Sequence, residues 1–388
     1  MASACGRGEH SVQKNIFVII GTRPEAIKMA PIIREIRSRS TMHAHVCVTS
    51  QHREMLHGIL PFFEIAPDSD LDIMRAGQTL DDVFSAIFGQ LPKIFAEFRP
   101  DVTLVQGDTA TCLAGALASF NQRIPVGHVE AGLRTHDLGN PFPEEGFRQM
   151  VSRIATFHFA PAPEAANALK REGITRNVHI TGNTVVDALL YAKNHIEQHP
   201  EAARIPEIPQ ALHNGQRRFA LITGHRRENF GSPFRNVCRA IQTLAGRYPD
   251  CDFVYPVHLN PQVQSVVHET LSGIPNVRLI PPQPYLPFVG LMRNCFLIIS
   301  DSGGIQEEAP TLGKPVLVTR KTTERPEAVQ AGTCILVGTE TEAIVSAFAR
   351  LMENSAAYKS ISSIPNPYGD GASAKYICDI LEKASAPA

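Results

Sequence analysis

Short apolar runs rich in β-branched residues alternate along the chain with longer amphipathic stretches, and this alternation limits the folds open to the sequence. Helix-like segments such as 80–97 and 236–247 separate the runs. Strands separated by helices predict parallel sheets with right-handed crossovers. About six strands in each half therefore predict an α/β fold of two doubly wound parallel-sheet domains. The runs predicted as strands are 15–20, 45–49, 102–106, 126–129, 156–160, 178–181, 219–223, 252–256, 277–280, 296–300, 316–319 and 335–337.

The length of 388 residues also favours two domains, because about 100–200 residues make one domain. A polar, proline-rich stretch at 194–216 indicates a boundary between them. A dense turn signal at 365–371 precedes a last helical pattern at 373–383. We expect a flexible leader at 1–14, a first domain at 15–187 and a second domain at 188–371.

Charge and composition exclude several classes of protein. The chain has 37 Lys and Arg against 38 Asp and Glu, a net charge of −1, which argues against generic binding to nucleic acid or anionic membranes. No apolar run approaches the roughly 18 residues of a membrane span, and the first 14 residues do not resemble a signal peptide. Eight cysteines without a CxxC pair predict reduced, buried thiols. We expect a cytoplasmic protein.

Polar residues follow the predicted strands of the first half, where ligands bind in doubly wound sheets. Arg23 and Lys28 lie in a helix start after the first strand, a pattern typical of anion binding or of a capped surface helix. Asp108 follows the strand at 102–106, where it could act on a substrate or cap a helix. Both alternatives are open from the sequence.

The segment around Glu130 is the densest in chemistry-bearing residues. Glu130 ends a short apolar strand, where burial would raise its pKa toward the range of a general acid or base. Pro141 and Pro143 stiffen the loop that carries Glu144. No third ligand accompanies His128 and Glu130, so we expect no metal site. A salt-bridged loop is the alternative.

The second half offers a basic strand end. His225 and two arginines follow the strand at 219–223, where they could meet a pyrophosphate or form a solvated basic turn. No Gly-x-Gly-x-x-Gly follows a predicted strand and no Walker loop is present. NAD enzymes and P-loop NTPases are therefore disfavoured, and we expect no cofactor.

A glycine-rich helix start gives the clearest phosphate signal. Ser302, Gly303 and Gly304 open a helix after the strand at 296–300, and glycine allows a phosphate to approach the backbone closely. Glu308, about one turn further, could accept hydrogen bonds from ribose hydroxyls. Arg325 follows the next strand and is predicted on the same rim.

Taken together, these segments resemble the non-hydrolysing UDP-N-acetylglucosamine 2-epimerases. The shared motifs, in family order over about residues 15–385, are GTRPEAIK, QHREML, GDT, HVEAGLRT, PFPEE, GHRREN, YPVHLNP, SDSGG-QEEAP, TTERPEAV and NPYGDG. The resemblance implies two Rossmann-like domains of GT-B type with the substrate in the cleft between them. It also implies a terminal helix, residues 372–388, that crosses back to the first domain, and a homodimer. Gln106 departs from the family pattern, which usually has His before GDT.

The resemblance also assigns roles to individual residues. Catalytic positions are implied at Asp108, Glu130, Glu144 and His225. Contacts to substrate, pyrophosphate, uracil, phosphate and ribose are implied at Arg23, Lys28, Arg134, Gln283, Phe288, Ser302, Gly303, Gly304, Glu308 and Arg325.

The implied reaction converts UDP-N-acetylglucosamine reversibly to UDP-N-acetylmannosamine. The C2 hydrogen of the sugar is not α to a carbonyl, so simple deprotonation is unfavourable. Loss of UDP from C1 would acidify it and give a 2-acetamidoglucal, to which a proton and UDP then return. A hydrolysing epimerase that releases N-acetylmannosamine and UDP is one alternative. A GT-B glycosyltransferase and a non-catalytic nucleotide-sugar sensor are the others.

Overall fold

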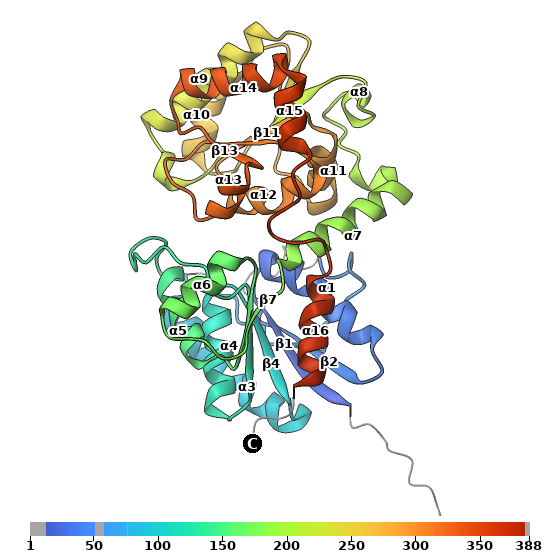
Figure 1. Ribbon diagram of the computed structural model, residues 1–388, viewed down its shortest axis with the longest axis vertical. Coiled ribbons are helices and arrows are strands. Elements are labelled where there is room, and N and C mark those ends of the chain that lie inside the picture. Colours follow the sequence, from blue (N-terminus) through green and yellow to red (C-terminus); the bar gives the residue numbers. More distant parts are fainter. Residues whose placement is uncertain (1–12, 51–57, 76, 385–388) are drawn as a thin grey trace, which may run out of the picture. The chain divides into compact units, whose positions relative to one another are not determined.

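The chain folds into two compact units, each built around its own parallel sheet. The computed structural model describes residues 13–50, 58–75 and 77–384. Of these, residues up to Thr184 and residues 372–384 form the first unit, and Val185–Gly371 forms the second (Figure 1). Among the helices of the described residues, none is long and apolar enough to cross a membrane.

The first unit contains a seven-stranded sheet in the order β3-β2-β1-β4-β5-β6-β7. Strands β4 and β5 are buried along their whole length, because helices cover both faces of the sheet. The strands are β1 (Lys14–Ile20), β2 (Met42–Val48), β3 (Ser69–Asp70), β4 (Val102–Gln106), β5 (Val126–Val129), β6 (Phe157–Ala160) and β7 (Val178–Ile180). The helices are α1 (Arg23–Ser38), α3 (Leu80–Phe98), α4 (Ala110–Asn121), α5 (Glu144–Ile154), α6 (Pro163–Arg171) and α16 (Ser373–Lys383).

The second unit contains a six-stranded sheet in the order β10-β9-β8-β11-β12-β13. The strands are β8 (Phe219–Thr223), β9 (Asp252–Pro256), β10 (Val277–Ile280), β11 (Leu297–Ser300), β12 (Val316–Val318) and β13 (Cys334–Leu336). The helices are α7 (Thr184–Gln198), which begins at the last residue of the first unit, α8 (Gln210–His213), α9 (Ser232–Arg247), α10 (Pro261–Leu271), α11 (Tyr285–Asn294), α12 (Gly303–Glu308), α13 (Pro326–Ala331), α14 (Thr341–Glu353) and α15 (Ser355–Ser362). Three short 3₁₀ helices are η1 (Pro200–Ala203), η2 (Arg227–Asn229) and η3 (Ala309–Leu312).

Alternate side chains of each strand point to opposite faces of its sheet, so each face has its own apolar core. In β1, Phe17 and Ile19 pack into a cluster with α3, α4 and α5, which cover one face of the first sheet (Figure 1). Helix α1 packs on β1 and β2, and α16 lies beside α1. Arg39 fixes this pair of helices, because its guanidinium lies 2.6 Å from Asp379 and 2.8 Å from Glu382.

The observed elements confirm the predicted α/β fold and its predicted strands. Strands β4, β5, β8, β9 and β10 have the bounds expected from the sequence, and the other predicted strands shift by one to three residues at an end. Strand β3 was not predicted, because its two residues, Ser69 and Asp70, offer no apolar run. The described cysteines are free and buried, as expected. Cys5 and the QHREML motif at 51–56 lie outside the described residues.

Candidate active site

Both sheets reverse their strand order at one position, and the predicted site residues follow the strands at these positions. The reversal lies between β1 and β4 in the first unit and between β8 and β11 in the second. In doubly wound sheets, ligands bind outside the carboxyl ends of the strands at such a reversal. Arg23 opens the helix after β1, and Asp108, His225 and Ser302 lie in the loops after β4, β8 and β11. The topology therefore supports a ligand site at this edge in each unit.

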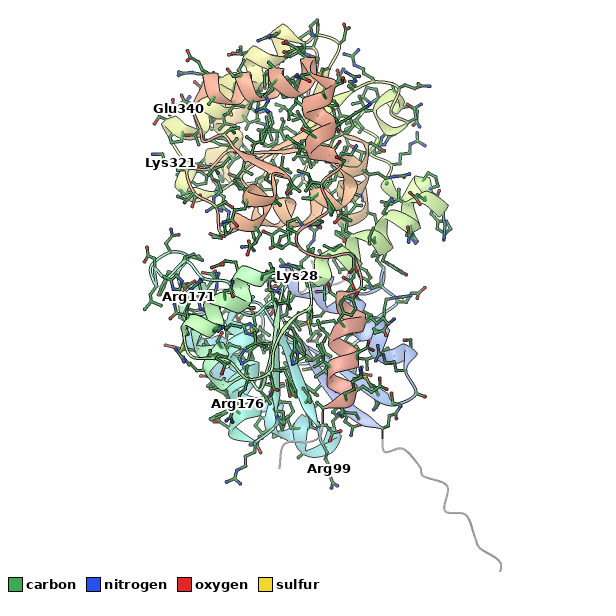
Figure 2. All side chains as sticks on the ribbon, viewed as in Figure 1. Lys28, Arg99, Arg171, Arg176, Lys321 and Glu340 are labelled. Carbon is green, nitrogen blue, oxygen red and sulfur yellow. The ribbon has the colours of Figure 1, made fainter. Side chains whose placement is uncertain are left out.

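Lys28 and Glu130 form an ion pair at the carboxyl edge of the first sheet. In Figure 2, Lys28 lies at the opposite end of the first unit from Arg99, which precedes β4. Its Nζ is 2.5 Å from Oε2 of Glu130, and both side chains are largely buried. Gln106 Nε2 donates to the same carboxylate oxygen. Lys28 and Gln106 thus both hold the Glu130 carboxylate, and Gln106 is one of the positions where this chain departs from the family pattern.

The backbone at Glu130 adopts a conformation that non-glycine residues rarely take. Its φ is 67°, in the left-handed region. Gly107 N donates to Val129 O and Ala131 N donates to Phe159 O, each over 3.0 Å, so the neighbouring strands hold the residue in place. Such strain is characteristic of functional sites, where the surrounding structure enforces it.

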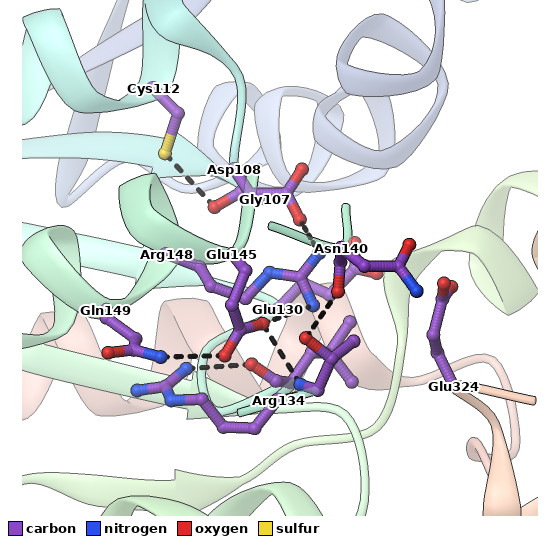
Figure 3. Close-up of polar contacts among 12 residues, drawn as sticks. Gly107, Asp108, Cys112, Glu130, Arg134, Asn140, Glu145, Arg148, Gln149 and Glu324 are labelled. Atoms are coloured by element: carbon purple, nitrogen blue, oxygen red, sulfur yellow. Dashed lines mark hydrogen bonds and ion pairs between the residues drawn. The ribbon is translucent and has the colours of Figure 1, made fainter. Parts of the chain in front are cut away.

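Asp108 belongs to a second charged group, formed with helix α5. Its Oδ2 is 2.6 Å from Nη2 of Arg148, whose Nη1 is 3.4 Å from Oε2 of Glu145. Figure 3 shows these three side chains close together with Glu130 and Arg134 nearby. Glu145 is fully buried and accepts hydrogen bonds from the backbone N–H groups of Thr135 and His136.

Hydrogen bonds decide the charge state of Glu145. Burial acts to raise its pKa, but hydrogen bonds from Gln149, Thr135 and His136, together with the positive charge of Arg148, outweigh burial and lower the pKa. Glu145 is therefore a carboxylate that fixes the loop before α5.

Glu144 begins helix α5 and is half-buried. It follows two cis peptide bonds, Asn140–Pro141 and Phe142–Pro143. Within residues 13–50, 58–75 and 77–384, its carboxylate has no hydrogen bond or ion pair. Glu144 thus differs from Asp108 and Glu130, which are each held by a cation.

Arg134 points into the protein. Its side chain is 1 % exposed, and Nε and Nη2 donate to the two carboxylate oxygens of Glu172 over 2.7 and 3.0 Å. Nη2 also donates to Ser152 Oγ, and Nη1 donates to the carbonyl of Leu133. This geometry makes Arg134 a support of the loop after β5.

His128 is likewise turned inward. Its Nε2 lies 2.7 Å from the carbonyl oxygen of Gly107, and burial lowers its pKa to about 3. Among the described residues, no three His, Cys, Asp or Glu side chains gather in a way that could hold a metal ion.

In the second unit, Asp301 organises the loop after β8. Its buried carboxylate accepts hydrogen bonds from the backbone N–H groups of His225 and Arg226 and from Nδ2 of Asn229. The His225 ring stacks on His258 with a centroid separation of 5.0 Å. Burial lowers the pKa of His225, and the charge of Asp301 opposes this shift. The ring of His225 is partly exposed and favours the neutral form.

Two guanidinium groups lie beside the glycine pair that opens α12. A Cβ built on Gly303 would lie 3.6 Å from Nη2 of Arg226 and 3.8 Å from Cζ of Arg325. Arg325 Nε pairs with the buried carboxylate of Glu307, which fixes the guanidinium. On Gly304, a Cβ would lie 3.9 Å from both Glu308 Oε2 and Ser302 Oγ. The structure therefore brings together the residues that the sequence predicted for phosphate and ribose.

The predicted uracil contacts lie at the start of α11. Gln283 Nε2 donates to the carbonyl of Pro281 over 2.8 Å, and Phe288 is half-buried on the helix. Both residues precede β11 and its glycine-rich loop in the same unit.

Sequence reasoning missed three charged residues that hold the predicted ones. Arg148 contacts Asp108, Asp301 fixes the loop of His225, and Glu25 joins two loops at the first strand reversal. Arg148 lies four residues after Glu144, and this spacing on the same helix face could have indicated it. Asp301 and Glu25 lie inside recognised motifs but carry no signal of burial in the sequence itself.

Comparisons with known proteins show to which family the chain belongs. A family model described as UDP-N-acetylglucosamine 2-epimerase matches residues 34–382. The UDP-N-acetylglucosamine 2-epimerase of Yersinia pestis is 50% identical over 370 residues, which cover 95% of this chain and 97% of that protein. The crystal structure of UDP-GlcNAc 2-epimerase from Neisseria meningitidis bound to UDP-GlcNAc matches with a TM-score of 0.88 and 47% identity, covering 95% of this chain and 100% of that one.

A more distant structure gives the same result. The Methanocaldococcus jannaschii UDP-GlcNAc 2-epimerase in complex with UDP-GlcNAc and UDP matches with a TM-score of 0.79 and 33% identity, covering 95% of this chain and 100% of that one. The order of the motifs, the paired α/β sheets and these matches along nearly the whole chain lead to one conclusion: the chain belongs to the UDP-N-acetylglucosamine 2-epimerase family.

Proposed function

We propose that this protein interconverts UDP-N-acetylglucosamine and UDP-N-acetylmannosamine without net hydrolysis. In the first step, the C1–O bond to UDP breaks with its electron pair leaving on UDP, and a carboxylate takes the C2 proton. The product is a 2-acetamidoglucal with a C1–C2 double bond. In the second step, a proton adds to the opposite face of C2 and an oxygen of UDP re-forms the bond to C1, so atoms and charge balance.

The observation that carries the proposal is the set of carboxylates at the carboxyl edge of the first sheet. Proton transfer on both faces of a sugar needs at least two acid–base groups, and Asp108, Glu130 and Glu144 are the candidates. Arg148 holds Asp108 and Lys28 holds Glu130 in fixed positions. Pre-organised groups of this kind contribute to rate by orientation. The departing UDP needs retention, for which we propose His225 and Arg23.

We propose that the glycine-rich start of α12 holds the diphosphate. The guanidinium groups of Arg226 and Arg325 both lie within 4 Å of a Cβ built on Gly303, and an anion there could receive charge-assisted hydrogen bonds. Ser302 and Gly304 complete this phosphate site, and Glu308 would bind the ribose. Gln283 and Phe288 would bind the uracil, and Lys28 the sugar nucleotide.

Incubation with UDP-N-acetylglucosamine alone in D₂O, followed by ¹H and ³¹P NMR, tests the proposal. The expected result is UDP-N-acetylmannosamine with deuterium at C2 and no accumulation of free UDP. Free N-acetylmannosamine with stoichiometric UDP would instead identify a hydrolysing enzyme. Turnover only after addition of an acceptor would identify a glycosyltransferase, and binding without turnover a sensor.

A further inference from the structure

Glu25 is a buried carboxylate that bonds to two loops at once. It is 1 % exposed and lies in the first turn of α1. Its Oε2 accepts hydrogen bonds from the backbone N–H groups of Gly21 and Thr22 over 3.0 and 2.6 Å. Its Oε1 accepts a hydrogen bond from the Thr109 hydroxyl over 2.7 Å. The two oxygens thus connect the loop after β1 to the loop after β4.

Thr109 continues this connection into the next helix. Its Oγ1 accepts a hydrogen bond from Cys112 N over 3.0 Å and so caps the N-terminus of α4 while it donates to Glu25. The loop after β1 also touches the first turn of α4 directly, because a Cβ on Gly21 would lie 2.2 Å from Oγ1 of Thr111. Close contact and hydrogen bonds therefore fix α1 and α4 against each other at the strand reversal.

A capping role alone does not account for this arrangement. The cap of α1 requires only Oε2, whereas Oε1 is committed to the neighbouring loop. Burial, opposed by these hydrogen bonds, raises the pKa of Glu25 to about 7, so the buried charge is unfavourable in itself. Burying a carboxylate costs free energy, which hydrogen bonds offset only in part. A function other than stability is thus the better reason for a carboxylate here.

We infer that Glu25 is a positioning residue that sets Asp108 against Arg23. Arg23 follows Thr22 in the chain and Asp108 precedes Thr109, so each lies next to a residue that donates to Glu25. The inference rests on the proposed function, in which both residues act on the same substrate. Loss of the bridge lets the two loops move separately and reduces kcat, because a misplacement of about 1 Å can cost about 10²-fold in rate.

Thr109 offers a sharper test than Glu25 because Thr79, in the same unit, also caps a helix N-terminus with its hydroxyl and can serve as a control. Thr79 caps α3 by accepting from Asp82 N, as Thr109 caps α4, but has no bond to Glu25. T109V, T109S, T79V, E25Q and the double variant E25Q/T109V are compared by kcat and KM for UDP-N-acetylglucosamine and by melting temperature. We expect T109V to lower kcat at least 10-fold with KM changed less than about threefold.

The controls separate positioning from stability. T109S keeps the hydroxyl and should retain wild-type kcat, and T79V should lower the melting temperature but not kcat. E25Q/T109V should be no slower than T109V, because both changes break one connection. Wild-type kcat in T109V would overturn the inference while leaving the proposed function intact. A wild-type enzyme without turnover of UDP-N-acetylglucosamine would overturn both.

Discussion

Asp108 and Arg148 form an ion pair in which Oδ2 lies 2.6 Å from Nη2, and the arginine side chain is only 8 % exposed. The same guanidinium faces Glu145, which is fully buried. One cation therefore serves two carboxylates, one proposed to act on the substrate and one that fixes the loop before α5. Removing the Arg148 guanidinium leaves Glu145 without this positive charge and breaks the ion pair of Asp108.

R148L is expected to destabilise the protein by about 3 kcal/mol, because breaking a buried ion pair leaves an uncompensated charge. R148K keeps the charge but not the planar fork, so we expect a smaller loss of stability and a reduced kcat. Urea denaturation and steady-state kinetics measure the two effects. Equal stability of R148L and the wild type would contradict the role given to this pair.

D108N, E130Q and E144Q are each expected to reduce kcat by about 10²–10⁴-fold, the range typical of a lost acid–base group. The substitutions keep the size of the side chain, so the circular dichroism spectrum should not change. E97Q on the exposed face of α3 is the matched control and should retain full activity. A single carboxamide variant with wild-type kcat would remove that residue from the proposed chemistry.

G303A is expected to weaken UDP binding at least about 10-fold, or about 1.4 kcal/mol. The added methyl group makes only ordinary contacts with Arg226 and Arg325, so the fold should tolerate it, yet it takes up space beside both guanidinium groups where the diphosphate is proposed to bind. Isothermal titration calorimetry with UDP gives the affinity. G246A, in helix α9 with nothing within 4 Å of the new methyl, is the control and should bind UDP normally.

Acidification is expected to destabilise the fold through two buried histidines. Burial lowers the pKa of His128 from 6.5 to about 3 and that of His158 to about 4. Both histidines have a lower pKa in the folded protein than in the unfolded chain, so below pH 6.5 the unfolded chain binds more protons. The free energy of unfolding therefore decreases as the pH is lowered from 6.5 to the folded pKa values. Each histidine should contribute a loss of about 2 kcal/mol between pH 6.5 and 4.5.

H128Q tests this pH dependence, because glutamine can donate to the Gly107 carbonyl but does not titrate. Denaturation between pH 4.5 and 8 should give a shallower acid slope for H128Q than for the wild type. H199Q replaces an exposed histidine and should keep the wild-type slope. Equal slopes of stability against pH for H128Q and the wild type would show that His128 does not cause the loss of stability in acid.

The sequence predicted the strands and the sheet edges at which the candidate site residues lie, since both depend on local patterns. Buried strands such as β4 and β8 are continuous apolar runs, and a parallel sheet brings their carboxyl ends to one edge. The direction of a side chain depends instead on distant partners. Arg134 has the residue type expected for substrate binding, but Glu172, 38 positions away, draws it inward. Arg148 reaches Asp108 only because α5 packs beside the loop after β4.

The first unit cannot complete its fold until helix α16, the last helix in the described part of the chain, has been synthesised. Ile377, Cys378 and Leu381 are buried, and the helix lies against α1, which is made more than 300 residues earlier. On the ribosome, the surface of α1 that receives these side chains stays uncovered while the whole second unit emerges and folds. The first unit is therefore translated first but completes its fold last. A nascent chain stalled before residue 373 exposes the apolar surface of α1 that α16 would cover.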